Sequence, residues 1–102
     1  MLHHLSIAVA DLERSGRFYD AALGALGYAR LWSDQRGIGY GPPGGGDKLA
    51  LRASPKGVTR PSPGFHLALA APGLRPHYGA SYYAAFVFDP DEYAIEAVTK
   101  AS

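Results

Sequence analysis

Two histidines stand in matching sequence contexts, His4 in HLSIAV and His66 in HLALAA. Each opens a short apolar segment typical of a β-strand, in which residues two apart share a face. Each histidine therefore shares its face with alanine or serine, while the bulky aliphatic side chains point the other way. A face of small residues leaves room for a ligand. The repeat predicts two related modules, each placing one imidazole over a shared cavity.

A carboxylate completes this set, because the segment YAIEAVT is typical of a last strand and places Glu96 on one of its faces. Two imidazoles and one carboxylate from three strands form a 2-His-1-carboxylate set, which holds a divalent first-row metal with positions left open for a substrate. Fe, Mn, Zn, Ni and Co all suit such a set, and the ion acts as a Lewis acid or activates a bound water or hydroxyl. The alternative interpretation makes His4 and His66 ordinary strand histidines and Glu96 a solvated edge residue. His3 is expected on the far face, outside the set.

The composition describes an ordinary globular chain of 102 residues, with 47% hydrophobic and 19% charged residues, and predicts a single domain. A net charge of +1 without a basic cluster argues against nucleic acid or an anionic membrane as the main partner. The absence of cysteine excludes disulfides and thiolate chemistry. No signal peptide and no apolar stretch of about 18 residues can be read, so we expect a soluble, cytoplasmic protein.

The order of the elements predicts an α+β fold made of two modules. Module one covers residues 1–53, a Pro/Gly/Ser-rich linker covers 54–64, and module two covers 65–102. The expected elements are strands over 3–10, 28–33, 37–41, 48–53, 65–70, 82–88 and 93–99, and one helix from the N-cap Asp11 to Gly27. Module one thus has the order β-α-β-β-β. Module two has only Pro72 and Gly73 where module one has its helix, so we expect it to lack that helix.

With these elements the chain resembles the vicinal oxygen chelate superfamily, which includes glyoxalases, bleomycin-resistance proteins, fosfomycin-resistance enzymes and extradiol dioxygenases. The resemblance rests on HLSIAVADLERSGRFYDAALGALGY at the start, FHLALAA in the middle and FVFDPDEYAIEA at the end. It implies two βαβββ-type modules that form a cupped mixed sheet around a metal. His4, His66 and Glu96 fall on three of the ligand positions. The resemblance also implies a small-molecule substrate and a homodimer.

The chain departs from the patterns of individual families. Glyoxalase-type isomerases place a further ligand or base on the fourth strand, where this chain has Ala50, so isomerase and epimerase chemistry are not expected. The extradiol signature would have Tyr in place of Phe86, Gly or Pro in place of Glu92, and a small residue in place of Arg75. Three metal ligands suit either an extradiol dioxygenase or a fosfomycin-type transferase.

Two function classes follow, and a third stays open. The first is a small metal-dependent enzyme (a dioxygenase, lyase or transferase) whose substrate chelates the ion through vicinal oxygens, with His77 or Tyr82 handling protons or orienting the substrate. The alternative is a metal-free drug-binding protein of the bleomycin-resistance type, in which aromatic side chains hold a flat ligand. The third is a shortened relative that keeps the scaffold without activity. Candidate substrate-binding residues are Trp32, Tyr40, Arg75, Tyr78 and Phe86.

Overall fold

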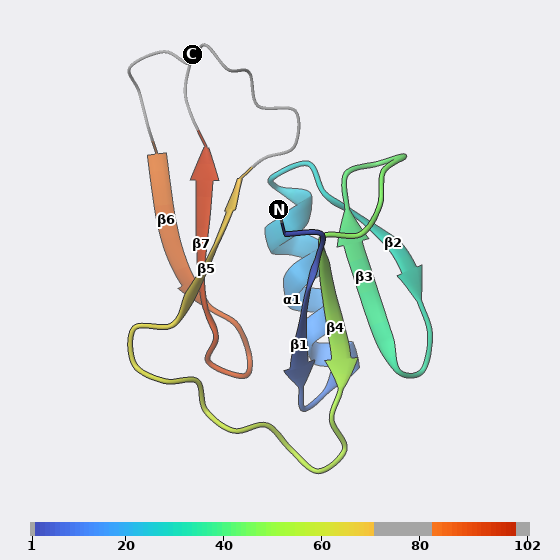
Figure 1. Cartoon of the computed structure of the whole chain (residues 1–102), viewed down its shortest axis with the longest axis vertical. Helices are drawn as coiled ribbons and strands as arrows, with labels where there is room; N and C mark the ends of the chain where they lie inside the picture. Colours follow the sequence, from blue (N-terminus) through green and yellow to red (C-terminus); the bar gives the residue numbers. More distant parts are fainter. Residues whose placement is uncertain (1, 71–82, 100–102) are drawn as a thin grey trace.

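The structure, a computed structural model, describes residues 2–70 and 83–99. Their elements are β1 Leu5–Val9, α1 Leu12–Gly24, β2 Ala29–Ser33, β3 Gly37–Gly41, β4 Leu49–Ala53, β5 His66–Ala70, β6 Tyr83–Phe88 and β7 Ala94–Thr99. These strands form two mixed sheets that lie side by side, with the order β1-β4-β3-β2 in the first and β5-β7-β6 in the second (Figure 1). The fold is α+β with a cupped sheet, as the sequence predicts. No helix in this described part is long and apolar enough to cross a membrane.

Helix α1 begins where the sequence predicts. The carboxylate of Asp11 accepts a hydrogen bond from the backbone N–H of Arg14 at 3.0 Å, which satisfies one of the free donors of the first turn. Ser15, Tyr19 and Leu23, four residues apart, are buried on one stripe of the helix. This stripe packs behind β1 and β4, beside the second sheet (Figure 1).

The two faces of the first sheet carry different side chains. Ile7 and Val9 of β1 and Leu51 of β4 are buried in the core cluster under α1. His4, which precedes β1, and Ser6 within it lie exposed on the opposite side. The alternation predicted around His4 is therefore present, because a strand sends successive side chains to opposite faces.

The second sheet repeats the connectivity of the first. Strand β5 pairs parallel with β7, and β6 pairs antiparallel with β7, as β1 and β3 pair with β4. In module one, residues 10–36 connect the equivalent strands and contain α1 and β2. In module two, the connection is residues 71–82, fewer than half as many, and it lies outside the described residues. The described part of module two has three strands and no helix.

The turn between β6 and β7 docks module two onto α1. The Tyr19 hydroxyl donates to Oδ2 of Asp89 at 2.6 Å, and both side chains are buried. The Tyr93 hydroxyl donates to the carbonyl of Ala8 at 2.9 Å. Ile95 of β7 belongs to the same buried cluster as the core of the first sheet. These contacts fix the position of β7, which carries Glu96, relative to the first module.

Candidate functional site

His66 and Glu96 lie together on the exposed face of the second sheet. His66 is paired with Ala94 and Glu96 with Ala68, so the two side chains are diagonal neighbours on adjacent parallel strands. Nε2 of His66 lies 3.6 Å from Oε1 of Glu96. The Glu96 side chain is only 14% exposed, whereas that of His66 is half exposed. The sequence predicts both residues as ligands, and the fold brings this pair together.

The backbone orients the His66 ring. Nδ1 lies 3.3 Å from the carbonyl oxygen of Gly64, which can only accept a hydrogen bond. Nδ1 is therefore the donor of this contact, and Nε2 is the ring nitrogen that faces Glu96. Its distance of 3.6 Å from the Glu96 carboxylate leaves room for a cation that both groups contact.

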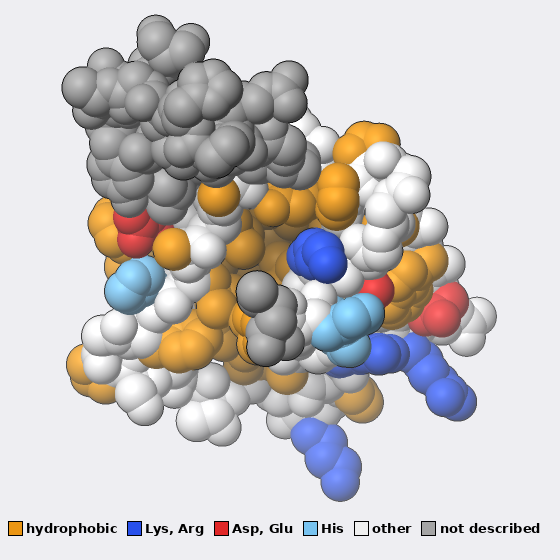
Figure 2. Space-filling view, turned by 45° about the horizontal axis from the view of Figure 1, so that its top comes forward, with side chains coloured by type: hydrophobic (Ala, Val, Ile, Leu, Met, Phe, Trp, Pro, Cys, Tyr) orange, Lys and Arg blue, Asp and Glu red, His pale blue; other side chains and the backbone are white. Residues whose placement is uncertain are grey.

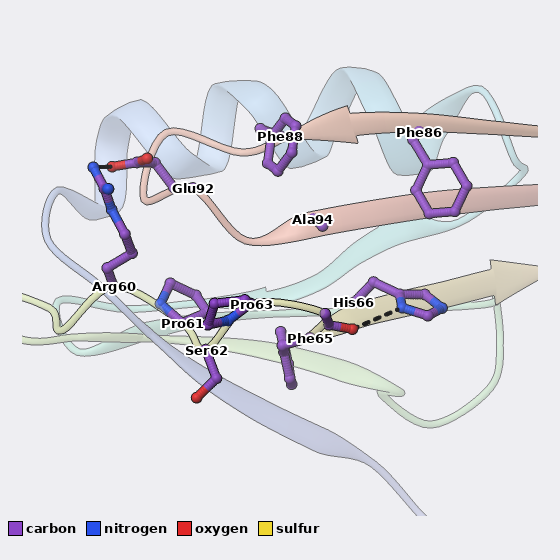
Figure 3. A pocket seen from close by; sticks show the side chains of 11 residues that line it. Arg60, Pro61, Ser62, Pro63, Phe65, His66, Phe86, Phe88, Glu92 and Ala94 are labelled. Atoms are coloured by element: carbon purple, nitrogen blue, oxygen red, sulfur yellow. Dashed lines mark hydrogen bonds and ion pairs between the residues drawn. The ribbon is translucent and has the colours of Figure 1, made fainter.

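His66, but not Glu96, lines a pocket of about 450 Å³, which we call the cup pocket. The linker forms one wall and strands β6 and β7 form the other, as Figure 3 shows. Its lining residues are Arg60, Pro61, Ser62, Pro63, Gly64, Phe65, His66, Phe86, Phe88, Glu92 and Ala94. Phe86 and Phe88 are 60% and 71% exposed, an unusual amount for aromatic side chains on a sheet. Because the volume falls within the usual range for small-molecule sites, the pocket can hold a compact ligand.

His4 is not grouped with His66 and Glu96 within one chain. Its ring packs edge-on against His3, and their Nδ1 atoms are 2.9 Å apart. The residues that the structure describes contain no group of three or more His, Cys, Asp and Glu side chains that could hold a metal ion. Figure 2 shows histidines at two separated places on one face, with hydrophobic side chains between them. His4 does border a cavity of about 260 Å³ that also reaches Ala68, the neighbour of Glu96 in register.

Trp32 and Phe86 remain candidates for ligand contact by their positions. The Trp32 indole lies over Gly37 and Gly39, on the face of β3 away from α1. The guanidinium of Arg52 stands 5.5 Å from the centre of the indole ring. The Phe86 ring meets the His66 imidazole edge-on, with the ring centres 5.8 Å apart. Phe86 therefore lies beside the candidate ligand pair.

Tyr40 has a different environment from the one expected of a ligand contact. It is 1% exposed and faces α1, on the opposite side of the sheet from Trp32. Its hydroxyl donates to Oδ1 of Asp20 at 2.9 Å, and the carbonyl oxygen of Gly16 lies 3.1 Å from the same hydroxyl. Burial and the hydrogen bond to Asp20 raise the pKa of Tyr40. In this fold Tyr40 packs in the core.

Four candidates lie outside the described residues: Arg75, His77, Tyr78 and Tyr82. Conversely, the structure adds Arg60, Phe88 and Glu92, which the sequence did not single out as ligand contacts. Phe88 could have been found, since it lies two residues after Phe86 on the same strand face. The path of the linker over the second sheet brings Arg60 to the pocket, and no local pattern predicts that path.

The comparisons with known proteins agree with this architecture. No protein-family model matches the sequence, and no curated protein matches it. A crystal structure from Albidiferax ferrireducens, of a glyoxalase/bleomycin resistance protein, is 25% identical, with a TM-score of 0.70 over 96% of this chain and 97% of that chain. A protein from Bacillus halodurans, provisionally named a glyoxalase, is 26% identical, with a TM-score of 0.68 over 97% and 95% of the two chains. The chain belongs to the vicinal oxygen chelate superfamily.

A third solved structure has the same fold and a lower sequence identity. An integron cassette protein of Vibrio cholerae is 19% identical, with a TM-score of 0.63 over 99% of this chain and 95% of that chain. At this identity it shows the fold alone.

Proposed function

We propose that this vicinal oxygen chelate protein is a small metal-dependent enzyme, whose substrate chelates a divalent transition metal through two vicinal oxygens. The observation that carries the proposal is the His66–Glu96 pair, of which His66 lines the cup pocket. Nε2 of His66 and Oε1 of Glu96 lie 3.6 Å apart. Donor atoms at 2.0–2.2 Å in adjacent positions of a five- or six-coordinate ion lie about 3 Å apart, so a small adjustment lets both reach the same ion.

The surroundings of His66 also suit a ligand. Metal-binding histidines almost always donate their other ring N–H to a carbonyl or carboxylate, which fixes the tautomer and the ring plane. The Gly64 carbonyl takes that position here. Glu96 is largely shielded from water, which strengthens its attraction for a cation.

The third ligand in this proposal is His4. Its imidazole is exposed and, among the described residues, has a side-chain hydrogen bond with His3 alone, so rotation of the side chain costs little. It reaches the ion either from the same chain or from a second copy in a homodimer. The metal would supply Lewis acidity and lower the pKa of a chelating hydroxyl or a bound water. The phenyl rings of Phe86 and Phe88 would cover the flat body of the substrate.

Candidate reactions are ring cleavage of the extradiol type and thiol transfer of the fosfomycin-resistance type. Ala50 is 1% exposed and carries no acid–base group, so isomerisation of the glyoxalase type should stay near background. The experiment is anaerobic loading with Fe(II) and assay of catechol ring cleavage, alongside Mn(II) loading and assay of thiol addition to an epoxide phosphonate. A turnover that His66→Ala abolishes and His3→Ala preserves supports the proposal; turnover equal in all three proteins contradicts it.

A second candidate function, metal-free binding of a flat ligand, is favoured by the apolar wall of the same pocket. Phe65, Phe86 and Phe88 are all more than two-fifths exposed there. In that case ligand binding would be unchanged by EDTA and by His66→Ala, and Phe88→Ala would weaken it. The metal-dependent proposal expects EDTA and His66→Ala to weaken binding.

A further inference from the structure

A second pocket, of about 530 Å³, lies at one end of the first sheet, and we call it the sheet-end pocket. Its lining residues are Ala10, Gln35, Arg36, Arg52, Ala53 and Pro55. They come from the ends of β1 and β4, the turn between β2 and β3 and the start of the linker, and Figure 1 shows these strand ends and the turn at the same end of the sheet. None of the six lines the cup pocket. The volume suits a small molecule, so this pocket can hold a ligand of its own.

The two arginines of this pocket differ from the other arginines that the structure describes. Four arginines each form an ion pair with a carboxylate, at N–O distances of 2.8–3.8 Å; they are Arg14, Arg17, Arg30 and Arg60. Within the described part of the chain, Arg36 and Arg52 form no ion pair, and their side chains form no hydrogen bond. The sheet-end pocket therefore gathers the two guanidinium groups whose charge no described carboxylate neutralises.

The carboxylate closest to them in sequence, that of Asp34, is engaged by the backbone of the turn between β2 and β3. Its Oδ1 accepts hydrogen bonds from the backbone N–H groups of Arg36 at 2.8 Å and of Gly37 at 2.9 Å. The carbonyl of Arg36 accepts from the N–H of Ala53 at 2.8 Å, which ties the turn to β4. The backbone of Arg36 is thus fixed at the edge of the pocket, while its side chain is exposed.

The Arg52 side chain lies against an aromatic ring. Its guanidinium carbon is 5.5 Å from the centre of the Trp32 indole, a contact in which the ring stabilises the cation and leaves the N–H donors available for an anion. Arg52 pairs in register with Gly37, and Arg36 directly precedes Gly37. The two arginines therefore start from adjacent positions of neighbouring chain segments. Because the pocket lies at the end of the sheet, long side chains from either face reach it.

We propose that the sheet-end pocket binds a small organic phosphate, whose phosphate group is held by Arg36 and Arg52. A guanidinium binds phosphate oxygens through two parallel hydrogen bonds. A phosphate monoester has three terminal oxygens and a charge close to −2 at neutral pH, so it engages two guanidinium groups at once, whereas a carboxylate has one charge and two oxygens. The amide of Gln35 is a further donor, and the alanines and the proline of the lining contact the carbon skeleton. This site is independent of the proposed metal-dependent function.

The test compares three ligands with the same three-carbon body: glycerol 3-phosphate, glycerate and glycerol. Their dissociation constants are measured by calorimetry on the full chain, with EDTA present so that no metal ion contributes to anion binding. We expect glycerol 3-phosphate to bind about tenfold more tightly than glycerate, the effect of one additional charged hydrogen bond, and glycerol to show no binding. Added salt should weaken the binding of the phosphate, because both arginines are exposed and their charges are screened.

Three variants locate the site. Arg36→Gln and Arg52→Gln should each weaken the binding of glycerol 3-phosphate by about tenfold, since each removes one guanidinium. Arg60→Gln is the matched control, because it removes an arginine that lines the cup pocket and already pairs with a carboxylate, and should leave the affinity unchanged. Circular dichroism checks that each variant keeps the fold. Arg36 has no contact with the Trp32 ring among those described, so its variant remains decisive if Arg52→Gln disturbs the sheet.

The outcomes that overturn the proposal are specific. Absence of glycerol 3-phosphate binding by the wild type overturns it, and so does an affinity for glycerate equal to that for the phosphate. An undiminished affinity in a folded Arg36→Gln variant, or a loss in Arg60→Gln as large as in Arg36→Gln, also overturns it. Binding of Co²⁺ by His66 and Glu96 is measured separately, so each of these failures leaves the proposed function untouched.

Discussion

The hydrogen bond between Tyr19 and Asp89 offers a quantitative test of how module two is held in place. Tyr19→Phe removes the only described donor to Oδ2 of Asp89, since Oδ1 already accepts from the backbone N–H groups of Asp91 and Tyr93 at 2.9 Å each. Tyr19 is 0% and Asp89 is 4% exposed, so water cannot replace the lost donor without a rearrangement. A buried hydrogen bond to a charged group contributes about 1.5–3 kcal/mol.

We therefore expect Tyr19→Phe to lower the free energy of unfolding by about 2 kcal/mol, which corresponds to a decrease of about 8–16 °C in Tm for a domain of this size. Urea unfolding followed by circular dichroism measures the change, and the m value should stay constant. Tyr93→Phe is the matched control: it removes a hydroxyl that donates to the neutral carbonyl of Ala8, and should cost about 0.5–1.5 kcal/mol. If Tyr19→Phe costs no more than Tyr93→Phe, the reasoning about the buried carboxylate is refuted.

Burial raises the pKa of Tyr19 and of Tyr40, as do the hydrogen bonds of Tyr19 to Asp89 and of Tyr40 to Asp20. The folded protein therefore keeps two protons that the unfolded chain loses above its tyrosine pKa of about 10. Stability should be constant below that pH and fall above it by up to about 1.4 kcal/mol per pH unit for each residue; denaturant unfolding at pH 9 to 11 measures the slope, and an unchanged slope in Tyr19→Phe would contradict this. Gly39→Ala should cost about 1–3 kcal/mol and change the Trp32 fluorescence, because the new Cβ would meet the indole Nε1 at 2.0 Å. Gly24→Ala in α1, where nothing lies within 4 Å, should instead stabilise the protein by about 0.5–1 kcal/mol in urea unfolding; equal effects of the two substitutions would contradict the packing described.

The strands and the helix were predictable because local patterns determine them. The alternation after His4 and His66 gave both the strands and their exposed faces, and the carboxylate of Asp11 marked the start of α1. The sequence also placed His66 and Glu96 in one ligand set, and the parallel pairing of β5 with β7 makes the two residues diagonal neighbours.

The remaining features depend on longer-range geometry. Tyr40 was predicted as a substrate contact. The Trp32 indole lies over Gly37 and Gly39 on one face of β3, so Tyr40 lies on the other face, which packs against α1. Reading GIGYG in steps of two shows this division, so the signal was present in the sequence. The position of His4 relative to His66 depends on how two sheets pack, and the approach of Arg60 depends on the path of the linker. The alternation of residues along a single strand or helix predicts neither of these two positions.

A calorimetric titration of the metal-free protein with Co²⁺ tests most directly the proposal that His66 and Glu96 hold a metal ion. We predict one ion per chain for the wild type and for His3→Ala, the matched control on a neighbouring exposed histidine. His66→Ala and Glu96→Gln should each weaken binding by at least tenfold, because each leaves one protein ligand fewer. The absorption spectrum of bound Co²⁺ should report nitrogen and oxygen ligands. If the wild type binds no Co²⁺, or if His66→Ala binds it as tightly as the wild type does, the metal site proposed here is wrong.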